Sequence, residues 1–103
     1  MTNDTIIKTV KKECNGKCFV DFYKAESSES LYFRISKGDI GYCFRISDHP
    51  TKCVIKSFTV SKNTKTKSVA RFVSNCIRRM NKKSLFKTFE EINVVRLNHL
   101  VRV

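Results

Sequence analysis

The sequence predicts an α+β fold: an antiparallel sheet of four to five strands with one main amphipathic helix packed on one face. Three observations favour it. A short internal repeat predicts a β-hairpin, the segment 68–81 has helical periodicity, and apolar residues make up 41% of the 103 residues. This length and composition suffice for one modest hydrophobic core, so we expect a single domain spanning residues 1–103.

The N-terminal part predicts a helix, a turn and a strand. Residues 4–12 have apolar side chains at helical spacing, and Asp4 is the expected N-cap. Asn15 and Gly16 form a dipeptide that is typical of turns. Apolar and polar residues then alternate over residues 17–24, which indicates a strand.

The repeat lies in the middle of the chain. Phe33-Arg34-Ile35-Ser36 recurs as Phe44-Arg45-Ile46-Ser47, and the segment between the two copies contains two glycines. This arrangement predicts a hairpin of two strands joined by a glycine-containing turn. Because side chains alternate across a sheet, Arg34 and Arg45 are expected on the face opposite the buried aromatic residues.

The second half of the chain predicts one further strand and the main helix. Cys53–Val60 is rich in β-branched and aromatic residues, but its phase is ambiguous because Lys56 shares a side with Phe58. In the segment 68–81, with Thr66 or Ser68 as its cap, apolar residues fall at i, i+3, i+4, i+7, i+8 and i+11. These are Val69, Phe72, Val73, Cys76, Ile77 and Met80.

The C-terminal part gives weaker signals. A shorter element is expected from residue 84, and it would bury Leu85, Phe86, Phe89 and Ile92. Residues 94–103 alternate in a way that predicts a final strand, although a frayed tail is the alternative.

The charge is concentrated in one segment. The formal net charge is +12, and residues 49–89 contain eleven Lys or Arg and no Asp or Glu, whereas residues 1–48 hold eight basic and seven acidic residues. A gathered charge of one sign favours an anionic partner, which could be nucleic acid, a nucleoprotein complex or an acidic protein surface. The alternative is a solvated helix face and loop.

We therefore predict a small non-enzymatic binding protein that engages nucleic acid or a nucleoprotein complex through a basic loop and helix. A genome-facing structural component is a further alternative. The candidate binding residues are Lys62, Lys65, Lys67, Arg71, Arg78, Arg79, Lys82 and Lys83, together with Arg34 and Arg45 of the hairpin. The two hairpin arginines have a competing interpretation as part of an ordinary exposed sheet face.

Catalytic and metal-binding patterns are weak. Cys14 and Cys18 have three residues between them, as do His49 and Cys53, but zinc sites more often use C-x-x-C, so core or surface thiols are the preferred interpretation. The run Ser47-Asp48-His49 is a poor catalytic relay, because adjacent strand residues point in different directions. Asp48 is expected to start an Asx-type turn. No carboxylate cluster suits a metal-dependent nuclease, and we expect no enzyme activity, metal or cofactor.

Other features concern the cell compartment. No run of about 18 apolar residues indicates a membrane span, and the first residues lack the order of a secretion signal. Five cysteines, an odd number, are then expected to be reduced in an intracellular protein. The Lys, Asn, Ile and Phe content with no Trp and one Pro is typical of AT-rich genomes, including those of phages and mobile elements.

The stretch Tyr42 to His49, YCFRISDH, resembles a strand motif of small phage-encoded basic α+β proteins, written Tyr-x-x-Arg-Ile/Leu-Ser-Asp/Asn-His. The family includes Cas9-inhibiting anti-CRISPR proteins, in which a strand and a long helix follow the motif. The resemblance implies an alternative function, in which this chain is an inhibitor of a nucleic-acid-guided nuclease. The chain departs from the family before residue 31, where it is nearly charge-neutral rather than basic.

Overall fold

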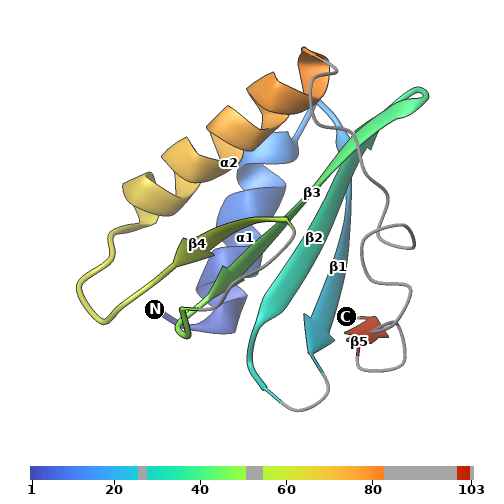
Figure 1. Ribbon diagram of the computed structural model, residues 1–103. Coiled ribbons are helices and arrows are strands. Elements are labelled where there is room, and N and C mark those ends of the chain that lie inside the picture. Colours follow the sequence, from blue (N-terminus) through green and yellow to red (C-terminus); the bar gives the residue numbers. More distant parts are fainter. Residues whose placement is uncertain (26–27, 51–54, 83–99, 103) are drawn as a thin grey trace.

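The computed structural model describes residues 1–25, 28–50, 55–82 and 100–102, and these form an α+β fold of two layers (Figure 1). Two helices cover one face of a five-stranded sheet with the strand order β4-β3-β2-β1-β5. The predicted fold class is confirmed. The elements are α1 (Asn3–Cys14), β1 (Phe19–Ala25), β2 (Leu31–Lys37), β3 (Ile40–Ser47), β4 (Lys56–Thr59), α2 (Thr66–Asn81) and β5 (Leu100–Arg102).

Helix α1 extends beyond its predicted bounds at both ends. The backbone N–H of Thr5 donates to Oγ1 of Thr2 at 3.2 Å, so Thr2 is the N-cap and the prediction of Asp4 was wrong. Asp4 lies in the first turn, where the helix dipole favours a carboxylate. Gly16, with a φ of 75°, follows the helix in the left-handed conformation that commonly ends helices.

The predicted hairpin is confirmed. Strands β2 and β3 pair antiparallel with Phe33 opposite Phe44, so the two copies of the repeat meet at their first residues. The connecting turn contains Gly38 at a φ of 60°, a conformation that side chains with a Cβ rarely adopt. Strand β1 pairs antiparallel with the other edge of β2, with Phe22 opposite Phe33.

Strand β4 differs from the expectation of an antiparallel sheet. It is shorter than predicted, its first expected residues lie outside the described ranges, and it runs parallel to β3, from Phe44 opposite Lys56 to Ser47 opposite Thr59. β4 pairs only with the last part of β3, from Phe44 to Ser47. The first residue of β4 therefore lies level with Phe44, about three residues or roughly 10 Å back from the end of β3. A short connection therefore suffices for this parallel pair.

Helix α2 begins at Thr66, and the predicted caps Thr66 and Ser68 were wrong. The N-cap is Lys65, and its side chain makes no capping hydrogen bond. The six apolar residues expected to face the core are all buried, as the periodicity predicted. Among the described residues, neither helix is long and apolar enough to cross a membrane.

A chain of aromatic rings joins the sheet to α2. The ring centroids of Phe22 and Phe33 lie 5.7 Å apart, those of Phe33 and Phe44 5.1 Å, and those of Phe44 and Phe72 5.6 Å. Phe58 of β4 stacks on Phe72 at 5.1 Å. These contacts fix the position of α2 over β3 and β4, and so they fix the site described below.

The predicted C-terminal strand is confirmed for residues 100–102, which pair antiparallel with β1. Its remaining predicted residues and the short element expected from residue 84 lie outside the described residues.

Candidate anion-binding site

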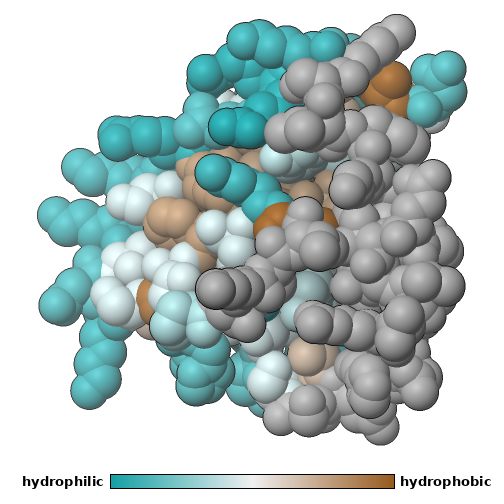
Figure 2. Space-filling model, viewed as in Figure 1, coloured by the Kyte–Doolittle hydropathy of each residue, from teal (hydrophilic) through white to brown (hydrophobic). Residues whose placement is uncertain are grey.

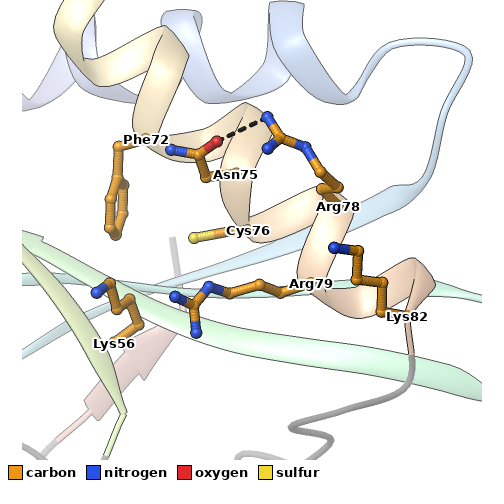
Figure 3. A pocket seen from close by; sticks show the side chains of 7 residues that line it. All are labelled: Lys56, Phe72, Asn75, Cys76, Arg78, Arg79 and Lys82. Atoms are coloured by element: carbon orange, nitrogen blue, oxygen red, sulfur yellow. Dashed lines mark hydrogen bonds between the residues drawn. The ribbon is translucent and has the colours of Figure 1, made fainter.

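A pocket of about 480 Å³ lies between β4 and the C-terminal half of α2 (Figure 3). Four cationic side chains line it, together with one amide, one thiol and one aromatic ring. The lining residues are Lys56, Arg78, Arg79, Lys82, Asn75, Cys76 and Phe72. Its size is in the range of small-molecule sites, about 300 to 1,000 Å³.

Helix periodicity explains why the α2 cations gather here. Asn75, Arg78 and Lys82 follow one another at i, i+3 and i+7, so they lie along one side of the helix. Nη2 of Arg78 donates to Oδ1 of Asn75 at 2.8 Å, which orients the guanidinium. Arg79 lies one position further round, between this row and the buried face, and it points across the pocket (Figure 3).

The fourth cation comes from the sheet. Lys56 is opposite Phe44 in the parallel pairing and two residues before Phe58, so it lies on the side of β4 that faces the helices. Its side chain is exposed and lies beside that of Arg79 in the pocket (Figure 3). The ambiguous phase of this strand is thereby explained, because the lysine faces a pocket on an otherwise core-facing side.

The pKa values of Cys76 and Tyr42 are affected both by burial and by the nearby cations of the pocket. Burial raises the pKa of the Cys76 thiol to about 12, although the charges of Arg79 and Lys56 act in the opposite direction. Burial also raises the pKa of Tyr42, against the charge and hydrogen bond of Arg79. The thiol is therefore neutral at physiological pH and does not offset the nearby positive charge.

The four cations lack intramolecular anionic partners among the residues that the structure describes: no ion pair there involves Lys56, Arg78, Arg79 or Lys82. Like charges that converge on one space repel one another and strengthen the local positive potential. Such an arrangement can hold an anion.

The other predicted cations extend this site along α2. Lys67 and Arg71 are exposed and continue the row of Asn75, Arg78 and Lys82 at helical spacing. We call Lys67, Arg71, Arg78 and Lys82 the basic row. Lys62 and Lys65 are exposed in the loop before the helix, and Figure 2 shows hydrophilic side chains over this part of the molecule. Lys83 lies outside the described residues.

The two hairpin arginines do not form the exposed basic face that was predicted. Arg45 is only 3% exposed, and its guanidinium donates to Ser57 Oγ at 2.9 Å, to Ser30 Oγ at 3.1 Å and to the carbonyl oxygen of His49 at 3.1 Å. Arg34 forms an ion pair with Asp21 at 3.3 Å. The physical reason is register: Ser57 lies opposite Arg45, and Asp21 lies opposite Arg34.

The Tyr42–His49 motif is built into the hairpin end. Tyr42 and Ser47 are buried, and Ser47 Oγ lies 2.8 Å from Ser30 Oγ and accepts from the backbone N–H of His49 at 3.1 Å. This contact is a serine turn at Ser47, the residue before the expected Asx turn at Asp48. His49 Nε2 lies 3.7 Å from Asp48 Oδ1, but Ser47 is engaged elsewhere, and the three residues form no relay.

The suggested zinc ligands can be placed only in part. Cys14 is buried beside Cys18, and burial raises the pKa of both thiols. Within the described part of the chain, no three His, Cys, Asp or Glu side chains gather as metal ligands would, and Cys53 lies outside that part.

The pocket was missed by the sequence analysis because Lys56 was not among the candidate residues. The sequence feature that could have revealed the pocket was a lysine on the apolar side of a strand.

Comparison with protein-family models, with curated proteins and with solved structures finds no match to this chain.

Proposed function

We propose that this protein is a non-enzymatic binding protein that engages nucleic acid, free or within a nucleoprotein complex, through the basic row of α2 and the adjoining pocket. The observation that carries the proposal is the convergence of Lys56, Arg78, Arg79 and Lys82 on one pocket with no ion pair to the other described residues. Phosphate groups are the abundant anions that lysine and arginine bind in this way.

The length of the basic row favours a polymeric anion over a small one. Lys67 and Lys82 are fifteen residues apart in the sequence, and at about 1.5 Å per residue they are separated by roughly 22 Å along the helix. A nucleic-acid strand advances about 3.4 Å per phosphate in duplex DNA, so the row spans roughly six phosphates. A single small anion would use only one end of it.

The proposal is tested by measuring fluorescence anisotropy with labelled 20-mer DNA and RNA, single- and double-stranded, over a series of salt concentrations. We expect sequence-tolerant binding whose affinity falls steeply with salt, by about 0.9 log units per neutralised phosphate for each tenfold rise in salt on duplex DNA. If no DNA or RNA binds at low salt, the proposal is wrong.

A matched pair of variants separates a specific surface from overall charge. One variant changes Arg71, Arg78 and Lys82 to Glu, and the control changes Lys8, Lys12 and Lys17 to Glu. All six side chains are exposed, and both variants lower the net charge equally. We expect the α2 variant to lose at least about 100-fold in affinity and the control less than about threefold. Equal losses in both variants would contradict the assignment to α2.

A further inference from the structure

We infer that the pocket between β4 and α2 holds the terminal phosphate of a nucleic-acid strand whose backbone lies along the basic row. This inference rests on the proposed function and assigns a distinct role to the pocket. Its first basis is position: Arg78 and Lys82 belong both to the row and to the pocket lining. A strand that follows the row therefore reaches the pocket at the C-terminal end of α2.

The pocket offers a ligand donors from two elements. Lys56 projects from β4, while Arg78, Arg79 and Lys82 project from α2, and Cys76 and Phe72 line the pocket between them (Figure 3). An internal phosphodiester must leave room for the chain on both sides, whereas a strand end needs only one exit. Donors from two elements at one place thus favour an end over the middle of a strand.

The charge and donor count point the same way. A phosphate monoester carries about −1.5 to −2 at pH 7 and presents three terminal oxygens, whereas a diester carries one negative charge and two free oxygens. Two guanidinium groups can each bind a phosphate through two N–H donors, and two ammonium groups add further donors. Four cations are better matched by the monoester.

The position of Lys56 is the strongest single observation for a dedicated ligand. A hydrophobic residue on the helix-facing side of β4 would extend the apolar contacts of Phe58 and would add no repulsion to the three α2 cations. The chain instead places a cation there. A bound dianion would relieve the repulsion among the four groups.

The test uses one 12-mer sequence in three forms: with a 5′-phosphate, with a 3′-phosphate and with hydroxyl groups at both ends. Affinities are measured by competition anisotropy at fixed salt. We expect at least one phosphorylated form to bind about tenfold or more tightly than the hydroxyl form. We expect Lys56→Gln and Arg79→Gln each to remove that preference, and Arg71→Gln to weaken all forms equally and so retain it.

The outcomes separate this inference from the proposed function. If all three oligonucleotides bind equally to the unaltered protein, the pocket inference is overturned while the proposed function stands. The inference is also overturned if the preference survives in both pocket variants. If no oligonucleotide binds, the proposed function is wrong, and this inference, which rests on it, is overturned as well.

Discussion

Lys56 lies directly opposite Phe44 in the parallel pairing of β4 with β3, so a cation occupies the side of the sheet that the helices cover. The next pair on that side is Ile46 and Phe58, and both belong to the hydrophobic interior or pack against it. Lys56 therefore lies on the core-facing side of β4 but lines the pocket. This relationship has consequences for stability as well as for binding.

Lys56→Met should stabilise the protein while it weakens binding. The change removes repulsion with the three α2 cations and adds apolar contact beside Phe72, so we expect the free energy of unfolding to rise by up to about 1 kcal/mol. Urea denaturation measures the change. Lys62→Met in the exposed loop is the control and should shift stability by less than about 0.5 kcal/mol. A destabilised Lys56→Met would mean that the ammonium group itself supports the fold.

Arg45 should be required for stability rather than for binding. Its buried guanidinium joins Ser30, Ser57 and the His49 carbonyl, so Arg45→Ala would leave a void and remove three hydrogen bonds. We expect a loss of about 2 to 4 kcal/mol in the free energy of unfolding.

Two further variants make the role of Arg45 specific. Arg45→Lys keeps the charge but lacks the several N–H donors of the planar guanidinium. It should therefore be more stable than Arg45→Ala but less stable than the unaltered protein. Arg71→Ala, an exposed change of the same type, should alter stability by less than about 0.5 kcal/mol. If Arg45→Ala proved as stable as Arg71→Ala, the hydrogen bonds around Arg45 would contribute nothing measurable.

Phe44 is the ring on which the contact between sheet and helix depends. It stacks on Phe33 at an interplanar angle of 17° and meets Phe72 edge-on at 82°. We expect Phe44→Ala to cost about 3 to 5 kcal/mol, measured by thermal or urea denaturation. Phe19 is 80% exposed, so Phe19→Ala provides a control with the same change in side chain and little expected effect. Similar losses for the two variants would argue against this ring network.

Much of the fold could be predicted because local periodicity determines it. The repeat placed Phe33 and Phe44 on paired strands, and the 3.6-residue period identified the buried side of α2. The same period placed Arg78 and Lys82 together. These features depend on residues that are near in sequence, and so a single chain reveals them.

The remaining features depend on pairing between distant segments. Alternation is the same in either strand direction, so nothing in residues 53–60 indicated that β4 runs parallel to β3. That pairing puts Ser57 beside Arg45, which becomes buried, and it places Lys56 in the pocket with Arg79. Both the mistaken surface role of Arg45 and the omission of Lys56 have this one cause.

Cys76 should make stability fall at alkaline pH. Its pKa rises from an ordinary 9.0 to about 12 on folding, so the unfolded chain loses the proton first. The contribution is complete below about pH 9 and is lost as pH rises toward 12, by up to about 1.4 kcal/mol per pH unit. Compared with Cys76→Ala, the unaltered protein should therefore lose its stability advantage between pH 9 and 10.5 in urea denaturation series.

Val73→Ala supplies the control for this pH dependence, because it also removes a buried group from α2 but removes no titratable one. Its effect on stability should be the same at every pH. If the difference between the unaltered protein and Cys76→Ala is likewise constant, the charges of Arg79 and Lys56 must cancel the effect of burial on the thiol. Above about pH 9 a thiolate would then lie at the pocket wall and lower its positive charge, and the terminal-phosphate preference should weaken over that pH range.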